Sequence, residues 1–103
     1  MAHWAYYREF NFDRRDANIP ASEMDRISEI AAYLGQNPSL NVGLDGSMSG
    51  NGRERDLGDR RTAAVRDALI QAGVPASKIQ IGAFGDPDPG HERQVQVLIE
   101  TRA

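Results

Sequence analysis

The feature that most constrains the fold is the order in which two apolar periodicities alternate along the chain. Leu40, Val42 and Leu44 alternate with polar or small residues, as in a strand with one buried face. Apolar residues from Met24 to Leu34 recur instead at helical spacing. A second helical pattern and three further strand-like segments give the order β-α-β-α-β-β. This order predicts an α+β domain, a two-layer sandwich with two helices on one face of a four-stranded mixed sheet.

Local signals set the expected element boundaries. The expected strands are Tyr6–Phe12, Leu40–Leu44, Ile79–Ala83 and Val95–Ile99. The first helix is expected to begin at Pro20 or Ala21 and to stop at Gly35, with Met24 on its apolar stripe. The second runs roughly from Asp56 to Ala72, and Gly73 is expected to end it.

Length and charge limit the classes of function. The 103 residues fit a single domain, expected over 9–101, with 1–8 as an N-terminal extension that includes the beginning of the first strand. A net charge of −3 argues against a nucleic-acid partner. No apolar run approaches the roughly 20 residues that span a bilayer, so we expect no membrane insertion by this domain. With two histidines and no cysteine, neither a metal site nor a cofactor is expected.

A segment rich in glycine and arginine, from about 43 to 66, is the first candidate for a binding site. Eleven of the twelve basic residues are arginine, and five of these fall between Arg53 and Arg66. Acidic residues alternate with them, which is typical of a mixed helical face rather than a nucleic-acid stripe. Ser47 or Ser49 would need a base to act as a nucleophile, and neither histidine lies in a triad pattern. We therefore do not expect an enzyme.

Six segments, taken in order, resemble the OmpA-like peptidoglycan-binding domain. They are FNFD at 10–13, GQNPSLNVGLDG at 35–46, LGDRRTAAV at 57–65, AGVPASKI at 72–79, GAFGDPDP at 82–89 and RQVQVLI at 93–99. The resemblance covers roughly Glu9 to Thr101. It implies a non-catalytic periplasmic domain, associated with the outer membrane or cell wall, that binds peptidoglycan and anchors an envelope protein.

The resemblance also implies a ligand site between the second strand's loop and the second helix. In such domains an aspartate holds the ammonium of a diaminopimelate residue in the peptidoglycan stem peptide, and an arginine holds its carboxylate. Arg61 matches the arginine, and Gly46 matches the first glycine of the loop motif. The acidic position falls on Ser49, however. The asparagine position falls on Glu54, and the serine before the helix becomes Gly58.

Two residues could replace the missing acid. Glu54 lies near the start of the second helix, and Asp45 directly precedes the loop, although strand alternation places Asp45 on the face opposite Leu44. A neutral hydroxyl cannot replace a carboxylate opposite an ammonium, so we expect weakened peptidoglycan binding because of Ser49.

Two other interpretations stay open. Arg61 could be an exposed arginine that pairs with Asp59, Glu54 or Asp67. The whole domain could be a divergent copy that has lost peptidoglycan and serves as an interaction or assembly module for other envelope proteins. In that case Trp4 and Tyr6 would form an aromatic edge that contacts a partner.

Overall fold

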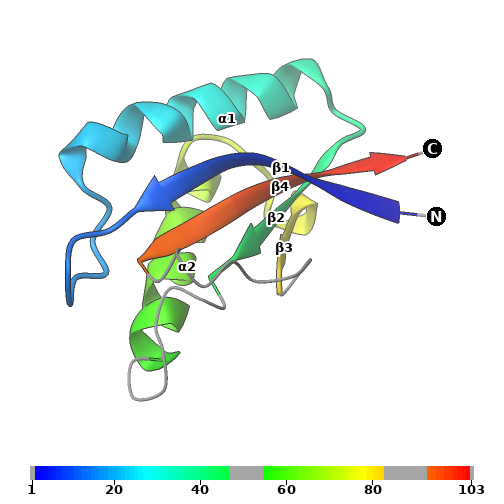
Figure 1. The fold of residues 1–103 in the computed structure, drawn as a ribbon. Helices are drawn as coiled ribbons and strands as arrows, with labels where there is room; N and C mark the ends of the chain where they lie inside the picture. Colours follow the sequence, from blue (N-terminus) through cyan, green and yellow to red (C-terminus); the bar gives the residue numbers. More distant parts are fainter. Residues whose placement is uncertain (1, 47–54, 83–92, 103) are drawn as a thin grey trace.

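The chain folds into the predicted order of helices and strands. This computed structural model describes residues 2–46, 55–82 and 93–102. The elements are β1 (Ala2–Asn11), the short 3-10 helix η1 (Ala21–Glu23), α1 (Met24–Gln36), β2 (Asn41–Asp45), α2 (Arg55–Gln71), the 3-10 helix η3 (Ala76–Lys78), β3 (Ile79–Ile81) and β4 (Gln94–Arg102). The α+β class is confirmed (Figure 1). Ala83 and the turn expected at 85–90 lie outside the described residues.

The four strands form one mixed sheet in the order β1-β4-β2-β3. β4 pairs antiparallel with both β1 and β2, whereas β2 and β3 pair in parallel because α2 carries the chain back between them. Ala2 lies opposite Arg102, so the two ends of the chain lie side by side (Figure 1).

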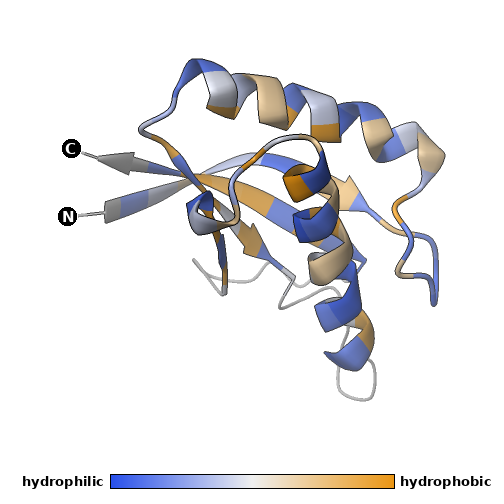
Figure 2. Cartoon of the chain, turned by 180° about the vertical axis from the view of Figure 1, so that it is seen from behind, coloured by the Kyte–Doolittle hydropathy of each residue, from blue (hydrophilic) through white to orange (hydrophobic). Residues whose placement is uncertain are grey.

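One face of the sheet carries the hydrophobic core. Val95, Val97 and Ile99 alternate along β4 and are buried on this face. Both helices contribute to the same buried cluster, through Ile27, Ile30 and Leu34 of α1 and Val65 and Leu69 of α2. The two helices therefore cover the same face of the sheet, and Figure 2 shows hydrophobic colouring along the strands beside α2.

The first strand is longer than expected. β1 begins at Ala2 rather than Tyr6, and its pairing with β4 shifts between Tyr6 and Arg8. Tyr7 is the extra residue of this bulge, and its ring stacks on Tyr33 of α1 with the centroids 5.0 Å apart. Phe12 follows the strand and is buried, as expected.

At the start of the first helix, the prediction of which side chain is buried is wrong. Met24, placed on the apolar stripe, is 45% exposed, whereas Glu23 is only 7% exposed. The 3-10 turn η1 precedes α1, and its three residues per turn change the phase of the helical pattern at this point. The Glu23 carboxylate accepts hydrogen bonds from the backbone N–H and the side-chain amide of Asn11, and it forms a 3.0 Å ion pair with Arg26. This network fastens α1 to the edge strand β1.

The two helices end differently. Gly35 was expected to stop α1 but lies inside it; Asn37 ends the helix by donating its backbone N–H to Leu34 O and its side-chain amide to Tyr33 O. Gly73 does end α2, as predicted, with a φ of 107°. The N–H groups of Gly73 and Val74 donate to Ile70 O and Leu69 O, which is the Schellman arrangement.

Candidate functional site

Arg61 is the centre of the candidate site, and it is buried. The helical spacing of α2 places Arg61 on the same side as Leu57 and Val65, which face the interior. Only 1% of Arg61 is exposed. The expectation that Arg61 is exposed is therefore wrong, whereas its pairing with Glu54 is not tested, because Glu54 lies outside the described residues.

The guanidinium of Arg61 holds the turn that follows β1. Its Nε donates to Asp16 O at 2.7 Å, and one Nη donates to Asp13 O at 3.0 Å. The guanidinium carbon also lies 5.5 Å from the centre of the Phe12 ring, within cation–π range. These contacts fix the orientation of the guanidinium.

The turn itself has an unusual backbone. Asp16 N donates to Asp13 O at 3.1 Å, which closes the turn. Arg15 within it has a φ of 60°, and among the described residues no other non-glycine residue has a positive φ. A side chain is rarely found in this left-handed region unless surrounding contacts hold it there. Arg61 supplies such contacts at both ends of the turn.

Gly46 allows the end of β2 to approach α2 closely beside Gly58. A Cβ at Gly46 would overlap Thr62 Oγ1 and would lie 3.2 Å from Gly58 O. Thr62 Oγ1 donates to Gly58 O at 2.9 Å, and both Gly58 and Thr62 are buried. The structure thus brings Gly46 and Gly58 together at the first turns of α2, one helical turn before Arg61.

Of the three remaining predicted site residues, the structure describes Asp45. Asp45 ends β2 opposite Gln96 and follows the buried Leu44, so alternation places it on the sheet face away from the helices. Ser49 and Glu54 lie outside the described residues.

The sequence did not predict that Arg61 would bind the carbonyls of Asp13 and Asp16. These backbone carbonyls cannot be predicted from the sequence, because any residue supplies a carbonyl.

No group of three or more metal-ligating side chains occurs in the part of the chain that the structure describes. Within the same residues, no helix has the length and apolar character needed to cross a membrane.

Comparison with known proteins identifies the family. The model of the OmpA family matches residues 11–98. The chain belongs to the OmpA family. The match includes all of α1, β2 and α2, and therefore the described residues of the candidate site.

Curated relatives of this OmpA family chain carry a consistent name. The peptidoglycan-associated lipoprotein of Agrobacterium fabrum is 33% identical over 81 residues, which is 76% of this chain and 46% of the relative. That of Haemophilus influenzae is 32% identical over 89 residues, which is 81% of this chain and 57% of the relative. The chain spans about half the length of these relatives.

Solved structures support the OmpA-like fold. The C-terminal domain of Helicobacter pylori MotB superposes with a TM-score of 0.74 at 18% identity, covering 94% of this chain and 87% of that one. The peptidoglycan-associated lipoprotein of Burkholderia pseudomallei gives 0.69 at 20% identity, covering 92% and 91%. At these identities the likeness concerns the fold.

Proposed function

We propose that this domain binds cell-wall peptidoglycan in the periplasm without catalysing a reaction, and so anchors a larger envelope protein. Its ligand is the diaminopimelate residue of the stem peptide. The proposal is supported by membership of the OmpA family and by relatives that are named peptidoglycan-associated lipoproteins. The observation that carries it is the fixed guanidinium of Arg61 beside the turn at Asp13–Asp16.

The chemistry of arginine fits this ligand. A guanidinium carries five N–H donors in a plane, and a carboxylate accepts two of them in parallel. The carbonyl bonds to Asp13 and Asp16 already restrict the Arg61 side chain. Less conformational entropy is then lost when the ligand binds, which favours affinity.

Burial of Arg61, in contrast, lowers the affinity for the ligand. Because Arg61 is 1% exposed, a ligand carboxylate reaches the guanidinium only if neighbouring residues move or a carbonyl bond is exchanged for the ligand. Either change costs free energy and lowers the apparent affinity. Together with the neutral Ser49 at the acidic position, this favours weak binding. Glu54 remains the candidate that supplies the missing negative charge.

Sedimentation with purified sacculi tests the proposal. We expect the wild-type chain to co-sediment with sacculi and Arg61→Ala to be lost from the pellet, because the carboxylate contact is removed. Arg66→Ala is the matched control, since Arg66 is exposed on the same helix and pairs with Asp67 at 3.1 Å. Circular dichroism must show that both variants are folded. Equal retention of a folded Arg61→Ala variant would contradict the assignment of Arg61.

One observation favours a second candidate function, a protein-interaction module. Tyr6 is 57% exposed on β1, an edge strand of the sheet, and the half-buried Trp4 lies on the same strand. Such an aromatic edge suits contact with another envelope protein. If the wild-type chain stays in the supernatant, and β1 variants such as Tyr6→Ser abolish self-association or partner binding, this second function replaces the first.

A further inference from the structure

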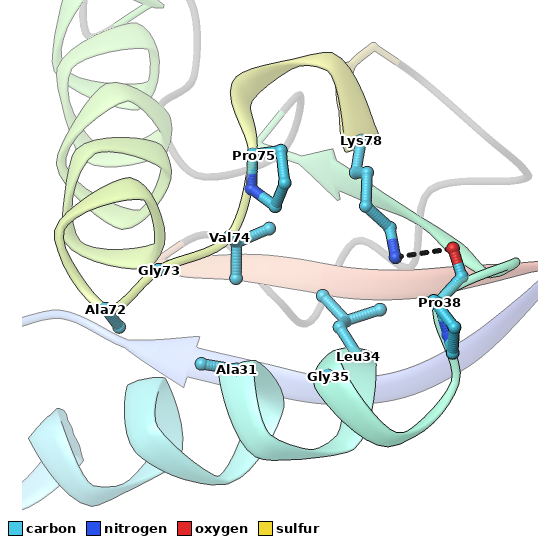
Figure 3. A pocket seen from close by; sticks show the side chains of 9 residues that line it. All are labelled: Ala31, Leu34, Gly35, Pro38, Ala72, Gly73, Val74, Pro75 and Lys78. Carbon is cyan, nitrogen blue, oxygen red and sulfur yellow. Dashed lines mark hydrogen bonds between the residues drawn. The ribbon is translucent and has the colours of Figure 1, made fainter.

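A pocket lies at the end of α2 that is remote from Arg61. Its volume is about 410 Å³, and its walls come from the last turns of α1, the turn after α1 and the connection from α2 to β3 (Figure 3). Ala72 at the pocket wall lies eleven positions after Arg61, which corresponds to about 16 Å along a helix axis. The pocket is therefore separate from the candidate peptidoglycan site.

The lining of the pocket is mostly apolar. Leu34 and Val74 are each 3% exposed and contribute apolar surface to it. Ala31 and Ala72 are short, and the neighbouring glycines have no side chains, which leaves the space between α1 and the end of α2 open. A volume in this range is typical of pockets for small molecules, about 300–1,000 Å³.

Lys78 supplies the charge. Its Nζ donates to Pro38 O at 3.0 Å, and Figure 3 shows this bond linking η3 to the turn after α1. Among the described residues that line the pocket, Lys78 alone has a charged side chain. An ammonium has three N–H donors, and the bond to Pro38 uses one of them. The bond thus holds a positive charge beside an apolar cavity.

Capping hydrogen bonds weaken the negative potential that the two helix ends place near this charge. Helix C-termini carry partial negative charge, which arises from carbonyls without hydrogen-bond donors. Here Leu34 O accepts from Asn37 N, Leu69 O from Val74 N and Ile70 O from Gly73 N. These caps reduce the negative potential that the helix ends place at the pocket.

We propose that this pocket binds a small aliphatic monocarboxylate. The hydrocarbon chain would lie against Leu34 and Val74, and the carboxylate would bind the Lys78 ammonium. A carboxylate is a stronger acceptor than the neutral carbonyl of Pro38, so it competes well for the same group. The proposal is independent of peptidoglycan binding.

A chain-length series tests the apolar part of the site. Butanoate, hexanoate and octanoate are titrated into the isotope-labelled 103-residue chain, and amide chemical shifts are followed by NMR. Each added methylene should tighten binding about fourfold until the pocket is full. The largest shifts should fall on Gly35, Gly73 and Val74. Affinity that does not depend on chain length, or shifts centred elsewhere, would overturn the proposal.

Charge variants test the polar part. Lys78→Gln should weaken hexanoate binding about fivefold and leave hexanol binding unchanged. Hexylamine should bind more weakly than hexanoate to the wild type. Ala31→Leu should block both hexanoate and hexanol by filling the space, and Ala72→Leu does so from the other wall if the first variant disturbs packing. Arg66→Gln is the exposed control. Unchanged hexanoate binding in Lys78→Gln or in the space-filling variants would refute the site.

Discussion

At the scale of single residues, Arg61 and Gly46 belong to the candidate site and also make contacts that stabilise the fold. Arg61 ties the turn at Asp13–Asp16 to α2, and Gly46 lets β2 end against Thr62. Both residues therefore affect the stability of the fold as well as the ligand site. Any binding experiment on them needs a separate measurement of folding.

The contact of Gly46 with Thr62 predicts a non-additive pair of variants. Gly46→Ala should lower the free energy of unfolding by about 2 kcal/mol, because the new methyl group overlaps Thr62 Oγ1. In a Thr62→Ala background the same change should cost at least about 1 kcal/mol less. Some cost should persist, since Gly58 O stays 3.2 Å away. Urea denaturation of the two single variants and the double variant measures these free energies of unfolding. Strictly additive effects would show that Thr62 Oγ1 is not the source of the cost.

Tyr6 predicts a pH effect. Partial burial, followed by the charge of Glu9 and its hydrogen bond, raises the pKa of Tyr6 above the usual 10.0. A group with a raised pKa in the folded state adds stability below its unfolded pKa, near pH 10, and that contribution is lost as the pH rises through the folded pKa. In a Tyr7→Phe/Tyr33→Phe background, ultraviolet absorbance reports Tyr6 alone. Glu9→Gln should lower its pKa without restoring 10.0; an unchanged titration would remove Glu9 as a cause.

At the scale of elements, the ends of helices distinguish what could be predicted from what could not. Gly73 was correctly expected to end α2, because a glycine followed by Val74 and Pro75 is a strong local signal. Gly35 is a similar local signal, but α1 continues past it because Asn37, two residues later, donates hydrogen bonds to carbonyls in the last turn of α1. Likewise, the 3-10 turn before α1 buries Glu23 and exposes Met24. A regular helical period predicts the opposite.

The two glycines give a matched pair of variants. Gly35→Ala should stabilise the chain by about 0.5–1 kcal/mol, because Gly35 lies inside α1 and a Cβ there meets nothing within 4 Å. Gly73→Ala should destabilise it by about 1–2 kcal/mol, because its φ of 107° is unfavourable for a side chain. Thermal unfolding of both variants checks the opposite signs. Two shifts of the same sign would contradict the account of these helix ends.

At the scale of the whole molecule, the order of elements and the two-layer sandwich were predictable, because each apolar period is a local property. The strand order β1-β4-β2-β3 was not predicted, because it rests on pairings between distant segments, such as Phe10 with Val95. For the candidate site, the structure gives the positions of three predicted residues: Gly58 and Arg61 lie in the first turns of α2, and Gly46 lies against Gly58 and Thr62. The burial of Arg61 could not be predicted, because it depends on a turn more than forty residues away.

Isothermal titration with a stem peptide measures whether this OmpA family domain recognises the diaminopimelate carboxylate through Arg61, as proposed. The control is the same peptide with lysine in place of diaminopimelate, which lacks one carboxylate. We expect weak binding of the diaminopimelate peptide, with a dissociation constant above about 1 μM, and at least about tenfold weaker binding of the lysine peptide. Submicromolar affinity would contradict the weakened site. Equal affinity for the two peptides, or binding of neither, would contradict recognition of the diaminopimelate carboxylate through Arg61.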